Sequence, residues 1–202
     1  MGEALTIVGS FLAGSIPFGL IVGRLFFGTD IRSAGSGNIG AANALRTYGR
    51  AGGAAVLVLD ALKGFVPALG AALWFGPRIA ALSALAAVLG HVFSPWLRFR
   101  GGKGVATYLG ALLAVFPLAA AAFALVWLVV ALRSRFASLS SLTATLVSAA
   151  VVTIRLSDVV VTAAYAAAVA TIFWAHRANV SRLRAGREVR LSFGRGTPQP
   201  RA

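Results

Sequence analysis

Six long apolar segments make up most of this chain, and they restrict its fold more than any other feature. They are Ala4–Gly23, Ala51–Phe75, Ile79–Leu97, Gly104–Leu132, Phe136–Ile154 and Val159–Ala175. A membrane-spanning helix needs roughly 20 apolar residues, with a range of about 17–25. Only 12% of the residues are charged, against roughly 25% in a soluble domain, and the mean hydropathy is +0.84. The sequence therefore predicts an all-α polytopic membrane protein.

The segment Gly104–Leu132 is longer than one span requires and has Pro117 near its middle. It forms either one kinked helix or two short helices hinged at the proline. The basic residues favour two passes, with the N-terminus outside. In that arrangement the outer loops hold only Arg78 and Arg155, Lys63 lies within a span, and the rest of the 19 Lys and Arg residues lie inside. Because basic loops face the cytoplasm, we predict seven transmembrane helices and a cytoplasmic C-terminus.

The formal net charge of +14 would suggest nucleic acid in a soluble protein. Here the charges flank spans, so we expect anionic substrates and no nucleic-acid partner.

Cys is absent, and the five Asp and Glu residues are too scattered for a metal cluster, so no metal or cofactor is expected. Residues 1–190 are expected to form one integral membrane domain, and residues 191–202 a disordered cytoplasmic tail. The N-terminus lacks a basic region before its apolar run, which favours a retained helix.

A first polar cluster contains small residues, amides and one guanidinium: Ser36, Gly37, Asn38, Asn43 and Arg46. Gly-rich backbone can direct N–H groups onto an anion, and a helix start directly after it adds a favourable dipole. The spacing of Asn38, Ala42 and Arg46 predicts one shared helix face, with Asn43 and Arg46 as i, i+3 neighbours. Such a face suits a phosphate. The alternative is a turn whose Arg only sets membrane orientation.

A second cluster places Lys103 among Gly101, Gly102 and Gly104, directly before an apolar helix. The missing side chains let backbone approach a ligand closely. The spacing differs from a Walker A loop. His91 lies just upstream, where a structural role and a catalytic role are equally compatible with the sequence.

A third cluster follows the last span, where His176 and Asn179 are i, i+3 neighbours. Ser138 and Ser141 precede it in a segment that also lies inside, and such hydroxyls are often helix caps. The basic residues Arg184, Arg187 and Arg190 are interpreted as topology signals and lipid contacts. Within the second span, Asp60 and Lys63 are i, i+3 neighbours. Isolated charges in hydrocarbon are costly, so we expect them to pair.

Five stretches together carry a family resemblance: Ser36–Arg46, Asp60–Gly64, Gly90–Thr107, Ser138-Leu139 and His176–Glu188. In order and spacing they resemble the bacterial acyl-phosphate-dependent glycerol 3-phosphate acyltransferases of the PlsY type. The resemblance implies an enzyme of the bacterial inner membrane with its active site on the cytoplasmic face. Such an enzyme transfers a fatty acyl group from acyl phosphate to the 1-hydroxyl of glycerol 3-phosphate. The products are 1-acylglycerol 3-phosphate and phosphate, in the first step of phospholipid synthesis.

The resemblance also implies roles for single residues. Ser36, Gly37, Asn38, Asn43 and Arg46 match the phosphate-holding loop, and Gly101, Gly102, Lys103 and Gly104 match a second phosphate element. Ser141 or Ser138, with His176 and Asn179, match the remaining substrate contacts. Lys103, His176 and Asn179 are the expected catalytic residues. The chain departs from the family pattern at Ala42, where Thr is usual, and at Ser94, which stands before Pro95.

The chemistry and its alternatives follow from the same residues. An acyl phosphate has a good leaving group, so the site must mainly hold two anions together. Either His176 or the departing phosphate takes the hydroxyl proton, and the scarcity of acids and histidines favours the phosphate. The His-x4-Asp motif of thioester-dependent acyltransferases is absent. The alternative function is a transporter or channel for a phosphorylated anion, but no internal repeat is visible. Contact with the enzyme that makes acyl phosphate is left open.

Overall fold

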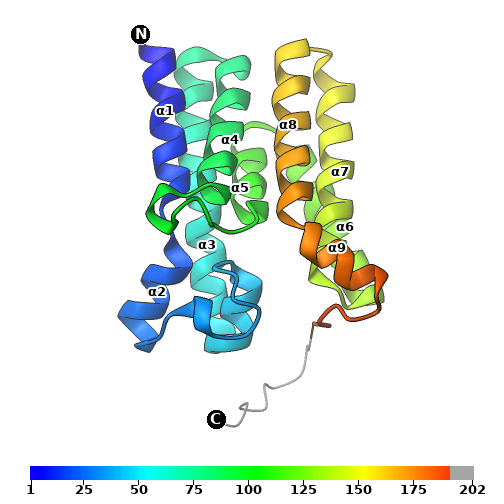
Figure 1. Ribbon diagram of the computed structural model, residues 1–202. Helices are drawn as coiled ribbons and strands as arrows, with labels where there is room; N and C mark the ends of the chain where they lie inside the picture. Colours follow the sequence, from blue (N-terminus) through cyan, green and yellow to red (C-terminus); the bar gives the residue numbers. More distant parts are fainter. Residues whose placement is uncertain (192–202) are drawn as a thin grey trace.

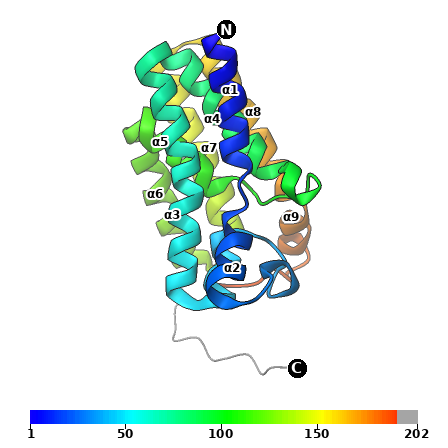
Figure 2. The same ribbon diagram turned by 90° about the vertical axis from the view of Figure 1, so that its left-hand side faces the viewer.

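The computed structural model describes residues 1–191, and this part of the chain is helical without a strand, as expected. Figures 1 and 2 show a bundle with the N-terminus at one end and residue 191 at the other. The elements are α1 (Gly2–Ser15), α2 (Phe18–Phe27), η1 (Ile31–Ser33), α3 (Ala41–Phe75), α4 (Pro77–Val92), η2 (Pro95–Leu97), α5 (Val105–Val115), α6 (Pro117–Ser134), α7 (Ala137–Leu156), α8 (Val159–Ala175) and α9 (Arg177–Arg184).

Five helical segments of the described chain are long and apolar enough to cross a membrane. A sixth is added if α8 and α9, which meet at a bend of 56°, count as one span, and α5 is apolar but shorter. Large apolar side chains such as Leu73, Trp74 and Ile154 are 73–79% exposed on the bundle surface. An apolar outer surface is what a lipid environment favours. The protein is therefore a multi-pass membrane protein.

The first apolar segment differs from the single helix expected over Ala4–Gly23. The helix α1 ends at Ser15, Ile16 is extended, and α2 begins only at Phe18. Pro17 explains the break, because it has no N–H and disfavours helical backbone at the residue before it. The main-chain carbonyl of Ile16 accepts a 2.8 Å hydrogen bond from Lys63 Nζ. A lysine in the neighbouring helix therefore satisfies a carbonyl at this break.

The hinge expected within Gly104–Leu132 is confirmed. The helix α5 ends at Val115, Phe116 has non-helical backbone, and Pro117 is the first residue of α6. The helix α5 has 11 residues, which corresponds to a rise of about 16 Å. The two halves are thus separate helices, and one of them is short for a bilayer.

The start of α3 corrects a prediction about the first polar cluster. The helix begins at Ala41, and Gly40 before it is extended. Asn38 therefore lies outside the helix, and the shared face predicted for Asn38, Ala42 and Arg46 is wrong for its first member. Gly37 adopts a positive φ of 70°, which glycine tolerates and which a right-handed helix does not contain. The glycine-rich stretch before Gly40 is therefore a loop.

The helices approach closely where glycines meet backbone. Gly14 of α1 lies against Ala87 of α4, and Gly64 of α3 lies against Thr107 of α5. A methyl group at either glycine would overlap main-chain atoms of the facing helix. Small residues are the usual means of close helix packing in membranes. These crossings hold α1, α3, α4 and α5 together as one half of the bundle.

The two charges inside α3 form the expected pair. Lys63 Nζ lies 2.7 Å from Asp60 Oδ1, and both side chains are almost fully enclosed, at 3% and 2% exposed. His91 Nδ1 of α4 lies 3.8 Å from the same carboxylate oxygen. A charged pair in an apolar bundle needs such mutual compensation.

Candidate functional site

Asn43 organises the first polar loop from within. Its side-chain NH₂ group donates to the carbonyls of Ile31, Ala34 and Asn38 over 2.9–3.1 Å. Its Oδ1 accepts a 2.8 Å hydrogen bond from the Ser36 main-chain N–H. The residue is 1% exposed. Asn43 therefore folds the loop, and its amide oxygen and nitrogen are already engaged within the protein.

The exposed members of this loop are free to meet a ligand. Ser36 and Gly37 are exposed, and Arg46 is exposed one turn after Asn43 on α3. Asn38 Oδ1 accepts a 2.9 Å hydrogen bond from the N–H of Gly40, the residue directly before α3. This bond holds the loop in place where it enters the helix. The loop thus offers a hydroxyl and a guanidinium beside the N-terminal end of α3, where an anion is favoured.

The second loop joins α4 to α5 and is tied down at both ends. The Gly101 and Gly102 N–H groups donate to the carbonyls of Val92 and His91 at 3.0 and 3.1 Å. Gly104 has a φ of +78° and caps α5, a conformation that favours glycine. Ser94 is buried and its hydroxyl donates to the Ser15 carbonyl at 2.7 Å. This departure from the family pattern thus attaches the loop to the end of α1.

Lys103 stands in this loop within a strongly basic environment. Burial lowers the pKa of Lys103 to about 8, the nearby Glu188 opposes this shift, and Arg182 and Arg46 lower the pKa further. The four charges belong to different parts of the chain, so the fold brings all three polar clusters together. A lysine ammonium held this way favours an anionic ligand, which would raise its pKa again.

Glu188 connects the third cluster to the start of α7. Its Oε1 accepts hydrogen bonds from Ser138 Oγ at 2.8 Å and Asn179 Nδ2 at 2.6 Å. Its Oε2 accepts a 2.8 Å hydrogen bond from Arg182 Nε. Burial raises the pKa of Glu188, but these hydrogen bonds outweigh it, so the net pKa lies below the ordinary value. The carboxylate is therefore ionised and fixes α9 against α7.

His176 lies at the bend between α8 and α9 and is 2% exposed. Its Nδ1 lies 2.8 Å from the Ile172 carbonyl, which can only accept, so Nδ1 carries the proton. Burial lowers the pKa of His176 to about 4, and the positive charge of Lys103 adds to this effect. At neutral pH the ring is therefore neutral, and Nε2 is an acceptor.

Ser141 is placed differently from Ser138. Its hydroxyl accepts a 3.1 Å hydrogen bond from Trp127 Nε1, and it lies one turn further along α7. Ser138, by contrast, bonds Glu188 directly. Of the two serines, Ser138 is therefore the one that joins the convergent cluster.

Arg182 and Glu188 fall within the family stretch His176–Glu188, but the sequence patterns assign neither of them a role in the site. Arg182 follows His176 and Asn179 at the same three-residue spacing, which was a signal on the helix that could have been used. Glu188 is one of only five acids in the chain, but its contact with Ser138 spans 50 residues of sequence.

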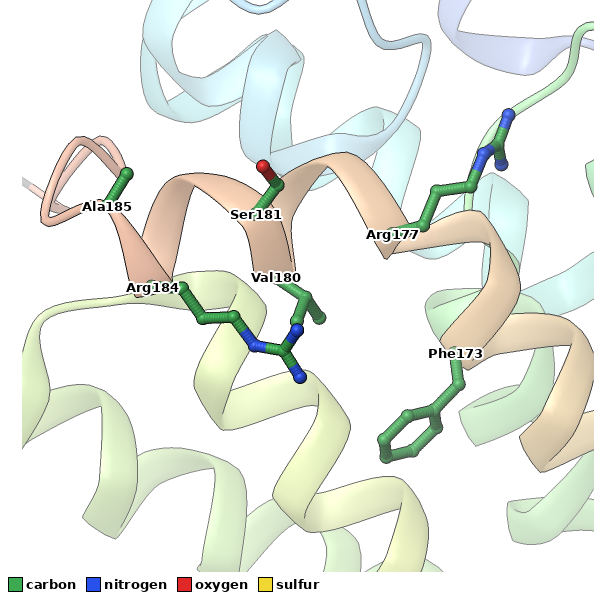
Figure 3. Close-up of a pocket in the computed structure, with 6 residues that line it drawn as sticks. All are labelled: Phe173, Arg177, Val180, Ser181, Arg184 and Ala185. Carbon is green, nitrogen blue, oxygen red and sulfur yellow. The ribbon is translucent and has the colours of Figure 1, made fainter.

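A groove lies along α9 and the end of α8 (Figure 3). It has a volume of about 600 Å³ and is lined by Phe173, Arg177, Val180, Ser181, Arg184 and Ala185. Phe173 and Arg184 point into it, whereas Ser181 and Arg177 point away. None of the predicted site residues lines this groove. It is separate from the convergent cluster, although α9 contributes to both.

Comparison with known proteins agrees with this arrangement. The glycerol-3-phosphate acyltransferase family model matches residues 4–186. A glycerol-3-phosphate acyltransferase of Bradyrhizobium diazoefficiens is 44% identical over 187 residues, which cover 93% of this chain and 94% of that protein. A Rhizobium etli protein of the same name is 46% identical over 188 residues, covering 93% of this chain and 90% of that protein.

Two crystal structures of PlsY, an integral membrane glycerol 3-phosphate acyltransferase, share the fold. The glycerol 3-phosphate form has a TM-score of 0.91 at 40% identity, and the lysophosphatidic acid form has a TM-score of 0.88 at 38% identity. Each comparison covers 95% of this chain and 96% of that one. With a family model that spans nearly all the described residues, the chain belongs to the glycerol-3-phosphate acyltransferase family of integral membrane proteins.

Proposed function

We propose that this protein transfers a fatty acyl group from acyl phosphate to the 1-hydroxyl of glycerol 3-phosphate. The hydroxyl oxygen attacks the acyl carbonyl carbon, and the bond from that carbon to the phosphate oxygen breaks. The hydroxyl proton leaves with a base, and the products are 1-acylglycerol 3-phosphate and phosphate. The observation that carries the proposal is the convergence of Arg46, Lys103 and Arg182 around one carboxylate, Glu188. Two phosphate-bearing substrates need this excess of positive charge.

The residues take distinct roles in this scheme. Lys103, presented by the loop of Gly101, Gly102 and Gly104, holds one phosphate, and Arg46 with Ser36 and Gly37 holds the other. Asn38 and Asn43 shape the first loop. Asn179 and Ser138, fixed by Glu188, orient substrate next to His176, and Ser141 supports them from the next turn of α7. Holding two anions in contact is the principal contribution to rate, since the leaving group is already good.

The departing phosphate is the base in this proposal. With a pKa of about 4, His176 holds a proton less tightly than the departing inorganic phosphate, because even a phosphate monoester has a second pKa of about 6. Nε2 of His176 accepts a hydrogen bond from the hydroxyl and aligns it, and the proton finishes on phosphate. An alternative with His176 as the base predicts a rate that falls with protonation of this residue in the acidic range.

The proposed topology has seven spans: α1 with α2, then α3, α4, α5, α6, α7 and α8. Residues 1–190 form one membrane domain in the bacterial inner membrane, and the active site faces the cytoplasm. The tail predicted for residues 191–202 lies outside the described residues, apart from Leu191, whose N–H donates to the Arg135 carbonyl. The lipid bilayer is a partner, and contact with the enzyme that makes acyl phosphate stays part of the proposal.

Labelling of single introduced cysteines tests the topology. Positions Thr47 and Arg133 should react only from the cytoplasmic side, and Gly76 and Ser157 only from outside. This expectation rests on the unequal distribution of basic residues. If Thr47 and Arg133 label from opposite faces, α5 and α6 do not cross separately, and the seven-span topology fails.

Product analysis tests the reaction itself. Detergent-purified protein mixed with palmitoyl phosphate and glycerol 3-phosphate should give 1-palmitoylglycerol 3-phosphate and equimolar phosphate. Palmitoyl-CoA in place of palmitoyl phosphate is the matched control and should give no product. A transporter or channel, the alternative, would release no phosphate from either donor. Absence of acyl transfer with a folded protein would overturn the proposal.

A further inference from the structure

The loop that carries Lys103 rests on a buried histidine that the proposed reaction does not use. His91 lies in the last turn of α4 and is 3% exposed. Its main-chain carbonyl accepts the Gly102 N–H at 3.1 Å, and the next carbonyl, of Val92, accepts the Gly101 N–H at 3.0 Å. The glycine loop is therefore bonded to the end of α4 directly before Lys103.

The imidazole of His91 also occupies the space beside Gly102. A Cβ atom added to Gly102 would meet Nε2, Cδ2 and Cε1 of the His91 ring well inside van der Waals contact. A Cβ atom added to Gly101 would instead meet the main-chain carbonyl of His91. The two adjacent glycines therefore face two different obstacles, one a side chain and the other backbone.

The opposite edge of the ring lies against residues of two helices, α5 and α3. His91 Nδ1 lies 3.3 Å from Thr107 Oγ1 of α5 and 3.8 Å from Asp60 Oδ1 of α3. Asp60 is paired with Lys63, which in turn donates to the Ile16 carbonyl at the break between α1 and α2. The contacts of the ring with α5 and α3 are thus made on its Nδ1 side, and the edge that carries Nε2 faces Gly102.

We propose that His91 is a positioning residue: its ring and its main-chain carbonyl fix the position of Gly102 in the Gly101–Gly104 loop and hence the position of Lys103. This inference rests on the proposed function, in which Lys103 holds a substrate phosphate. Adjacent Cα atoms are joined at a fixed 3.8 Å spacing, so a shift of Gly102 moves Lys103 with it. A displacement of about 1 Å at a reacting group can cost about 100-fold in rate.

A double-substitution experiment tests the proposal. His91→Asn keeps a polar atom near the position of Nδ1, within reach of Thr107 and Asp60, and removes Cε1 and Nε2. Gly102→Ala alone should reduce kcat/KM for glycerol 3-phosphate by about 100-fold. Gly102→Ala with His91→Asn should be at least about tenfold more active than Gly102→Ala, because Nε2, the nearest obstructing atom, is gone. The matched control is Gly101→Ala, which His91→Asn should not rescue because backbone obstructs it.

The single variant separates positioning from general stability. His91→Asn alone should raise KM for glycerol 3-phosphate about tenfold and leave kcat within about threefold, because the loop is less well placed and Lys103 is intact. An unchanged KM, or equal rescue of both glycine variants, would overturn the proposal. If His91→Asn does not fold, His91→Ser removes the same ring atoms and tests the same relief.

Melting temperatures keep this test independent of the proposed function. Gly102→Ala should lower the melting temperature, and His91→Asn should recover part of that loss, whereas the loss from Gly101→Ala should persist. If the wild-type protein acylates no glycerol 3-phosphate, the proposed function fails, and the melting series still decides whether the His91 ring supports Gly102. Absence of any recovery in melting temperature would overturn the inference.

Discussion

Asp60 and Glu188 are both carboxylates paired with cations, but their surroundings differ. Asp60 and its partner Lys63 are 2% and 3% exposed inside the bundle. Glu188 is 7% exposed, but its partner Arg182 is 42% exposed. In the interior, both members of the pair are withdrawn from any ligand. At the end of the bundle, the acid is enclosed and the cation reaches outward.

The difference distinguishes a charged pair that supports the bundle from a charged cluster that the proposed function assigns to binding. The positive charge of Lys63 is matched by Asp60 and by the Ile16 carbonyl, so the interior pair can only support its neighbours. Glu188 bonds Arg182, and its negative charge also acts on Lys103 and Arg46, so positive charge remains in excess, as the proposed phosphate site requires. Local charge balance therefore separates the supporting pair from the binding cluster.

Removal of one member of the interior pair is the strongest challenge to this comparison. Asp60→Asn leaves Lys63 charged and unmatched, which should cost about 3–5 kcal/mol of stability. The double change with Lys63→Met should cost less, although the Ile16 carbonyl then loses its donor. Melting of the detergent-purified variants measures both. Additive losses would contradict a coupled pair.

Lys103→Ala tests the other region through activity. Loss of a charge-assisted contact to a reacting phosphate should cost about 2–4 kcal/mol, or roughly 30- to 1,000-fold in rate, with the fold unchanged. Lys103→Arg should also be poor, because a planar fork does not replace a compact ammonium between glycines. Phosphate release measures the rate. Arg187→Ala is the control, since Arg187 is exposed and assigned to topology, and it should lose little. Retained activity in Lys103→Ala would remove the second loop from the site.

Glu188→Gln should have an intermediate effect. The amide keeps an acceptor for Ser138 or Asn179 but loses the charge that Arg182 and Lys103 face. We expect a stability loss of about 1–3 kcal/mol, because hydrogen bonds to a charged group are being weakened. Thermal melting with and without glycerol 3-phosphate measures it. A neutral result would mean that Glu188 does not hold α9 against α7.

The pH dependence should give the smallest effect. In the proposed mechanism Lys103 binds phosphate only when it is protonated, and its pKa in the free protein is about 8. As pH rises above 8 the charge is lost, so kcat/KM should fall up to tenfold per pH unit, equivalent to about 1.4 kcal/mol. The residual activity of Lys103→Arg should lack this alkaline decline, because a guanidinium stays charged. Rates corrected for uncatalysed acyl phosphate hydrolysis provide the measurement.

Local spacing predicted those features that depend on neighbours in the chain. The i, i+3 relation of Asp60 and Lys63 predicted their pair, and Pro117 predicted the hinge between α5 and α6. Pro17 carried the same kind of signal for α1 and α2. Hydropathy nevertheless predicts one helix across the apolar run, because it does not register a helix break.

Contacts between distant segments could not be read from spacing. Asn43 matches a phosphate-loop pattern, but its amide is used to fold the loop, which depends on three carbonyls brought to it by the turn. Glu188 meets Ser138 only because α7 and α9 lie together at one end of the bundle. A family motif identifies which residues gather, whereas the packing determines which of them keep free donors.

The shortness of α5 bears on the supply of acyl donor. In the proposed topology α5 crosses a hydrocarbon layer of about 30 Å with a rise of only about 16 Å, so the loop before it would be recessed. Figures 1 and 2 show the segment between α4 and α5 nearer the middle of the bundle than α2. Each methylene drawn out of lipid costs about 0.8 kcal/mol. If the donor had to rise by four methylenes, the cost of about 3 kcal/mol would rival the whole Lys103 contact. In the proposed arrangement, a recessed loop would let the donor's head group reach the lysine while its chain stays dissolved in the membrane.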